Sequence, residues 1–132
     1  MPYLFDENLI GVGRIVRKAR KDFDDVWVIG DPPCPITRGT ADEAWLPQSA
    51  RLARVVFRVD TDHLDHGTES YRAWREGRCK GFILNLQQSK STLWDQSLAL
   101  FRNWDRIENY VRDHAAEASW VAKITKGSVR PA

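Results

Sequence analysis

The stretch "YLFDENLI" at residues 3–10 runs from apolar residues directly into an aspartate, a glutamate and an asparagine, and then becomes apolar again. This pattern predicts a short buried strand that ends at Phe5 and leaves Asp6 at its carboxyl end. Residues 9–21, which follow, carry an apolar face of helical spacing. A strand followed by a helix is the opening unit of a parallel sheet, and open sheets of this kind bind ligands at the carboxyl ends of their strands.

After this stretch the chain continues to alternate strand-like and helix-like segments. Such alternation predicts an α/β fold, a three-layer α/β/α sandwich with a mostly parallel central sheet of about five strands and right-handed crossovers. We expect one domain over residues 1–132. The further strands are expected at residues 24–30, 54–60, 81–86 and 119–125, and the further helices at residues 41–53 and 68–77 and from residue 92 onward.

Capping residues indicate where the later helices begin. Thr40 or Asp42 is expected to cap the helix over residues 41–53, which Pro47 is expected to bend or restart. Thr92 and Asp95 have the spacing of a capping box, in which each residue bonds the backbone of the other.

Composition is that of a soluble globular protein, with 42% hydrophobic residues, 29% charged residues and six tryptophans. Trp94 and Trp104, at helical spacing, are expected in the core. Cys34 and Cys79 stand in no metal-binding or CxxC pattern, which favours buried or incidental thiols. Without a long apolar run or a basic leader, we expect a cytoplasmic protein with no membrane partner. The net charge of +2 does not by itself indicate a nucleic-acid partner.

Acidic residues recur at one expected edge of the sheet. Asp6 and Asp60 follow strands, and Asp42, or its neighbour Glu43, comes from a helix start at the same edge. Asp62 is a candidate fourth member. Carboxylates this close need protons or cations, and their oxygens suit Mg²⁺ or Mn²⁺. Taken singly, each of these acids is also explained as a cap, a turn or a solvated loop residue.

Three segments carry a resemblance to a known family. "LFDENL", "TADEAWLP" and "VVFRVDTDHL" resemble, in order and spacing, the three acidic motifs of PIN-like domains, in the compact subgroup that includes atypical VapC-type toxins of toxin–antitoxin pairs. The later "GFILNL", the tryptophan-rich helix and "SWVAKITKGSVRP" are similar to the closing elements of that subgroup. The third motif differs, because the family usually has Thr and Arg directly before the aspartate and this chain has Arg58 and Val59.

The resemblance implies a metal-dependent ribonuclease that hydrolyses RNA phosphodiester bonds at Mg²⁺ or Mn²⁺. By motif, Asp6, Asp42 and Asp60 would be the metal ligands and catalytic acids, with Asp62 as an accessory acid. A cognate antitoxin protein and a homodimer are the implied partners. The alternative is a catalytically inactive PIN-like domain that binds RNA or a protein.

Basic side chains around the expected edge are candidates for holding the RNA backbone, and each is also explained as ordinary solvated charge. These candidates are Arg14, Lys18, Arg38 and Lys90. His63 is expected in a solvated loop. Haloacid dehalogenase-like phosphatases and receiver domains share the strand-then-acid pattern, but the first leaves Asp6 unexplained and the second needs a lysine where "GFILNL" ends in Asn85 and Leu86.

Overall fold

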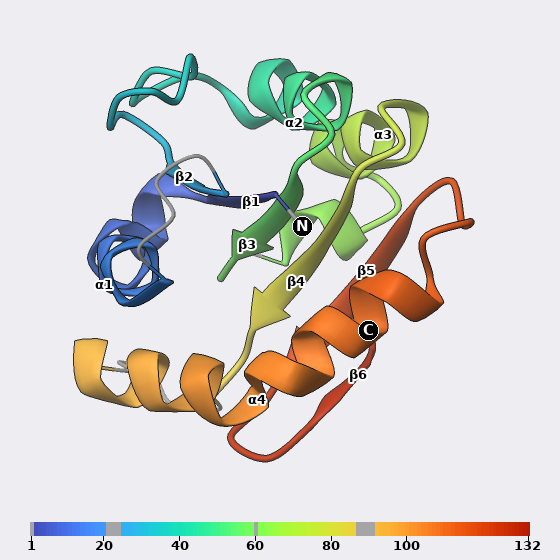
Figure 1. Cartoon of the computed structure of the whole chain (residues 1–132). Helices are drawn as coiled ribbons and strands as arrows, with labels where there is room; N and C mark the ends of the chain where they lie inside the picture. Colours follow the sequence, from blue (N-terminus) through green and yellow to red (C-terminus); the bar gives the residue numbers. More distant parts are fainter. Residues whose placement is uncertain (1, 21–24, 60, 87–91) are drawn as a thin grey trace.

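A six-stranded sheet forms the centre of the computed structural model, which describes residues 2–20, 25–59, 61–86 and 92–132 (Figure 1). The strands lie in the order β2-β1-β3-β4-β5-β6, and only the β5–β6 pair is antiparallel. The strands are β1 (Tyr3–Phe5), β2 (Val26–Val28), β3 (Val55–Arg58), β4 (Lys80–Leu84), β5 (Trp120–Ile124) and β6 (Val129–Pro131). The α-helices are α1 (Ile10–Arg20), α2 (Asp42–Arg51), α3 (Glu69–Glu76) and α4 (Leu93–Asp113), and short 3₁₀ helices are η1 (Glu7–Leu9) and η2 (Asp62–Leu64).

The expected α/β class and mostly parallel sheet are confirmed, with one strand more than the five expected. The additional strand, β6, comes from the basic tail and pairs with β5, Val129 opposite Ile124 and Pro131 opposite Ala122. It is short and exposed, and its pattern contains no buried apolar pair. Such an edge strand gives almost no signal in the sequence, because edge strands do not need the apolar alternation of central ones.

Alternate residues of the strands point into two separate apolar clusters. Tyr3 and Phe5 belong to the cluster that α1 and α4 cover, whereas Leu4 between them belongs to the cluster with α2 and α3. Figure 1 shows α1 and α4 on one side of the sheet and α2 and α3 on the other. Strands buried on both faces explain why the sequence segments read as nearly continuous apolar runs.

Two glycines allow close approach of helices to the sheet. A Cβ atom at Gly13 in α1 would lie 2.8 Å from Cβ of Phe5 and 2.9 Å from Cγ2 of Val28. A Cβ atom at Gly81 in β4 would lie 2.9 Å from Cη2 of Trp74 in α3 and 2.4 Å from the carbonyl oxygen of Val56 in β3. The glycine inside α1 therefore lowers helix propensity but lets this helix lie directly on β1 and β2.

The start of α2 differs from expectation. Its N-cap is Ala41, and no side chain caps the helix, so the prediction of a cap at Thr40 or Asp42 is wrong. Thr40 instead donates from Oγ1 to the carbonyl oxygen of Thr37. Pro47 lies inside one continuous helix and does not restart it. The carboxylate of Asp42 is left for contacts with other side chains.

The long helix α4 begins with the expected capping box of Thr92 and Asp95. Trp104 packs edge-on against Tyr3, at 5.2 Å between ring centroids, as expected of a core residue. Trp94 is 72% exposed, however, so its expected place in the core is wrong. The buried seam of α4 includes Asn103, whose amide donates to the carbonyl oxygens of Ala99 and Thr125. Because the polar residue Asn103 takes a buried position, the apolar residues of α4 alone do not show which side of the helix faces the sheet.

Candidate functional site at the carboxyl edge of the sheet

The direction in which successive strands are added to the sheet reverses between the parallel neighbours β1 and β3. From β1 the chain passes through α1 to β2 on one side, and then returns through α2, on the opposite face, to β3 on the other side. In open α/β sheets the carboxyl edge at such a switch point is where ligand crevices form. Asp6 directly follows β1 and Arg58 is the last residue of β3, so both lie at this edge.

Arg58 brings two of the predicted acidic residues together. Its Nε donates to Oδ2 of Asp6 at 3.4 Å, and its Nη2 donates to Oδ2 of Asp42 at 2.9 Å. The Arg58 side chain is 1% exposed, that of Asp6 is 4% exposed and that of Asp42 is 31% exposed. The predicted convergence of Asp6 and Asp42 is therefore observed, with a guanidinium lying against both carboxylates.

Trp45 fixes the other oxygen of Asp42. Its Nε1 donates to Oδ1 of Asp42 at 3.0 Å, one turn away along α2. The same indole ring lies 5.6 Å from the guanidinium carbon of Arg58. Trp45 is thus a buried anchor that orients the carboxylate toward the cation.

His63 is buried in the same network, not solvated as expected. Its Nδ1 lies 3.0 Å from Nη1 of Arg58. Because a guanidinium has only donors, Nδ1 must accept, and the neutral ring then carries its proton on Nε2. The ring also stacks at a tilt on Trp74, 4.3 Å between centroids. His63 therefore supports Arg58 and is sequestered from solvent.

Two of the predicted acids cannot be placed in this site. Asp60 lies outside the described residues, and although Asp62 begins η2, its side chain is not described. Glu43, the alternative to Asp42, is exposed on α2, and no ion pair places it against Arg58. Among the described residues, no three His, Cys, Asp or Glu side chains are grouped so that they could hold a metal ion.

A cluster of arginines surrounds Asp31 in the loop after β2. Arg14 binds both carboxylate oxygens at 2.7 and 2.8 Å, and Arg17 and Arg38 approach at 3.3 and 3.4 Å. The hydrogen bond from Arg14, reinforced by the three positive charges, lowers the pKa of Asp31 to about 2. Three cations around one anion leave an excess of two positive charges here.

This arginine cluster lies next to the acidic edge. The backbone N–H of Gly39 donates to Oε2 of Glu7 at 3.2 Å, which joins the loop of Arg38 to the segment of Asp6. Lys18 is exposed one helical turn beyond Arg14 on α1. Of the four basic residues predicted to hold substrate, two are thus in the cluster, Lys18 is on the adjoining helix surface, and Lys90 lies outside the described residues.

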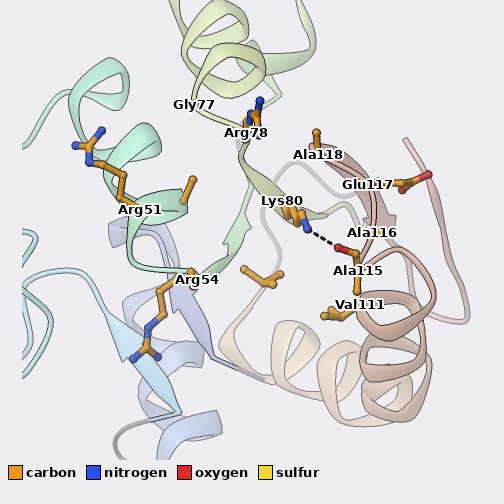
Figure 2. Close-up of a pocket in the computed structure, with 13 residues that line it drawn as sticks. Arg51, Arg54, Gly77, Arg78, Lys80, Val111, Ala115, Ala116, Glu117 and Ala118 are labelled. Carbon is orange, nitrogen blue, oxygen red and sulfur yellow. Dashed lines mark hydrogen bonds between the residues drawn. The ribbon is translucent and has the colours of Figure 1, made fainter.

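A cavity of about 650 Å³ lies at the opposite, amino edge of the sheet (Figure 2). Its lining includes Arg51, Arg54, Arg78 and Lys80. Figure 2 shows the three arginine side chains pointing in different directions, while Lys80 donates from Nζ to the carbonyl oxygen of Ala115 at 2.9 Å. These cations do not converge on one point, so we assign this cavity no ligand.

The chain was compared with protein-family models, curated proteins and solved structures. No family model, curated protein or solved structure matches the chain. None of the helices in the described ranges has the length and apolarity needed to cross a bilayer.

Proposed function

We propose that this chain is a PIN-like, three-layer α/β/α domain that acts as a Mg²⁺- or Mn²⁺-dependent ribonuclease, the toxin of a toxin–antitoxin pair. The observation that carries the proposal is the meeting of Asp6 and Asp42, from separate elements, on one buried cation at the switch point of the sheet. The motif resemblance adds Asp60 as a third acid, two residues beyond Arg58, and Asp62 as an accessory. An antitoxin protein, a homodimer and a cytoplasmic location belong to the same proposal.

A divalent ion fits this edge by charge and by the type of ligand. Two carboxylates from separate elements meet here, and carboxylate oxygens are the ligands that Mg²⁺ and Mn²⁺ prefer. Asp6 and Asp42 would hold such an ion. When bound, it would neutralise charge on the phosphate and lower the pKa of a water molecule.

The arginine cluster supplies the contact with the RNA backbone. Its excess positive charge attracts phosphates, and Arg14 and Arg38 are half exposed, so their free donors can reach phosphate oxygens. Asp31 orients these guanidinium groups. The hydrogen bond between Gly39 and Glu7 joins the cluster to the acidic edge. An RNA strand held by the arginines would therefore pass close to Asp6.

A second function, RNA or protein binding without cleavage, is favoured by Arg58 itself. A buried guanidinium already offsets part of the charge of Asp6 and Asp42 without any metal ion. A domain in which this arrangement is permanent would keep the arginine cluster as a binding surface and lack hydrolysis.

The test is RNA cleavage by the purified protein with Mn²⁺ or Mg²⁺, beside a chelator control. Asp42→Asn removes a carboxylate of the site, and Asp105→Asn, on the exposed surface of α4, is the control with the same change in charge. The ribonuclease proposal expects cleavage that requires the ion, is lost in Asp42→Asn and persists in Asp105→Asn. RNA binding that survives chelation, without cleavage, would favour the second function. If the protein neither binds nor cleaves RNA, both functions are contradicted.

A further inference from the structure

We propose that Arg58 is a built-in counter-ion of the acidic edge, which a divalent cation must displace before it can bind Asp6 and Asp42 together. The choice of Mg²⁺ or Mn²⁺ as that cation rests on the proposed function. The position of Arg58 does not, because it follows from the contacts of the chain alone.

Within the described residues, contacts reach the guanidinium from three separate elements. Nε faces Asp6 after β1, Nη2 faces Asp42 at the start of α2, and Nη1 faces His63 in η2. The rigid fork of an arginine matches such an arrangement, whereas the ammonium of a lysine is a single point. With its side chain 1% exposed, Arg58 has exchanged its water shell for these contacts.

A divalent ion would need the same oxygens. Arg58 contacts Oδ2 of both Asp6 and Asp42, and these two residues would hold a divalent ion. An ion held by the same carboxylates would lie close to the guanidinium, and the repulsion between the two cations is poorly screened away from water. Ion binding is therefore an exchange for the guanidinium, and its affinity is lower than in a site without Arg58.

The same contacts make the resting fold independent of metal. Carboxylates gathered in a buried place normally need a proton or an ion, and here Arg58 supplies a positive charge from the chain. The wild type should therefore keep its melting temperature in chelator. A variant without the guanidinium should depend on added ions.

The test compares four proteins by calorimetric titration with Mn²⁺ in metal-free buffer and by thermal melting in EDTA or Mn²⁺. Arg58→Met removes the charge and keeps an apolar stem, and Arg58→Lys keeps the charge but loses the fork. Arg54→Met is the matched control, because Arg54 lies at the other end of β3 and donates to the carbonyl oxygens of Tyr3 and Asp25. The wild type is the fourth.

We expect Arg58→Met to bind Mn²⁺ at least ten times more tightly than the wild type, and Arg58→Lys to fall between them. Arg54→Met should bind as the wild type does. Arg58→Met should melt at a lower temperature in EDTA and recover several degrees in Mn²⁺, a larger gain than that of the wild type. If Arg58→Met does not fold in either buffer, the affinity of Arg58→Lys relative to the wild type decides.

Equal Mn²⁺ affinity in the wild type and the Arg58 variants, or no binding by any of them, would overturn the proposal. This result is separable from failure of the proposed function. Tighter ion binding by Arg58→Met, with no RNA cleavage by the wild type, would support the counter-ion and contradict the ribonuclease. Ion-dependent cleavage by the wild type, with unchanged Mn²⁺ affinity in Arg58→Met, would support the ribonuclease and contradict the counter-ion.

Discussion

A buried guanidinium is stable only where its donors find acceptors, because burial removes its hydration. Arg58 meets this condition with Asp6, Asp42 and His63. The meeting of Asp6 and Asp42 at one edge could be predicted from the sequence, since both follow from the positions of strand and helix ends. The role of Arg58 could not, because a charged residue at the end of an apolar strand usually points into solvent.

The signal that could have found Arg58 is the alternation of β3. Residue 58 is on the same side of the strand as Val56, which packs into the cluster with Trp45 and Trp74. An arginine on the same side of a strand as a buried valine is itself buried, so it needs hydrogen-bond acceptors within the protein. The difference from the PIN-like pattern that the sequence resembles falls at this residue and at Val59.

Asp31 makes the stability of the protein depend on pH. Its pKa is lowered to about 2 by the hydrogen bond from Arg14, so its contribution is fully present above about pH 4 and is lost as the pH falls through about 2. We expect Asp31→Asn to lower the free energy of unfolding by about 1 kcal/mol at pH 7, discounted because Arg14 is half exposed. Urea unfolding of both proteins at pH 7 and pH 2 measures this, and a difference that does not shrink at pH 2 would refute it.

At the scale of single elements, α1 tests whether its glycines serve packing. Gly13→Ala would place its Cβ 2.8 Å from Cβ of Phe5, and overpacking of this kind costs about 1–3 kcal/mol, more than the helix propensity gained. At Gly11 the nearest atom is the flexible Cδ1 of Leu93, at 3.2 Å. We expect Gly13→Ala to melt at a lower temperature than the wild type and Gly11→Ala not to. Equal melting temperatures for both variants would show that the contact with β1 is looser than described.

The turn after α2 contains a residue in the left-handed region. Ala53 has φ 55°, and the N–H of Arg54 bonds back to the carbonyl oxygen of Ser49, the helix-ending arrangement in which glycine is favoured. Ala53→Gly should therefore raise the free energy of unfolding by up to about 1 kcal/mol. Ala44→Gly, at an exposed position within α2, should lower it by about 0.5–1 kcal/mol. Chemical denaturation would contradict the account if both changes had the same sign.

For the whole molecule, the order of secondary-structure elements could be predicted almost completely, because each buried strand and amphipathic helix writes its own local pattern. Strand order is not local, and no segment of the sequence specifies that β1 lies between β2 and β3. The exposure of Trp94 has a similar cause, since Asn103 takes a buried position on α4 by bonding the distant residue Thr125.

The exposed face of α4 should contribute little to the stability of the single chain. Trp94 is 72% exposed and Phe101 is 46% exposed, one heptad apart on the helix. Trp94→Ser should change the free energy of unfolding by no more than about 0.5 kcal/mol, as at other surface positions. Trp104→Ser should cost several times more, because Trp104 packs on Tyr3 and Phe57. Urea denaturation of the two variants checks this. Equal losses of unfolding free energy would contradict the exposed position of Trp94.

A double-mutant cycle between Arg58 and Asp42, read as the free energy of unfolding in EDTA, tests whether the guanidinium is the counter-ion of the acidic edge. Arg58→Met alone should cost about 3–5 kcal/mol, because it removes the counter-ion of the buried Asp6 and of the partly buried Asp42. Adding Asp42→Asn should cost clearly less than it does in the wild type, giving a coupling of at least about 1.5 kcal/mol. Arg58→Met with Asp31→Asn should be additive within about 0.5 kcal/mol. Additivity for Arg58 and Asp42 as well would contradict a built-in counter-ion at the acidic edge.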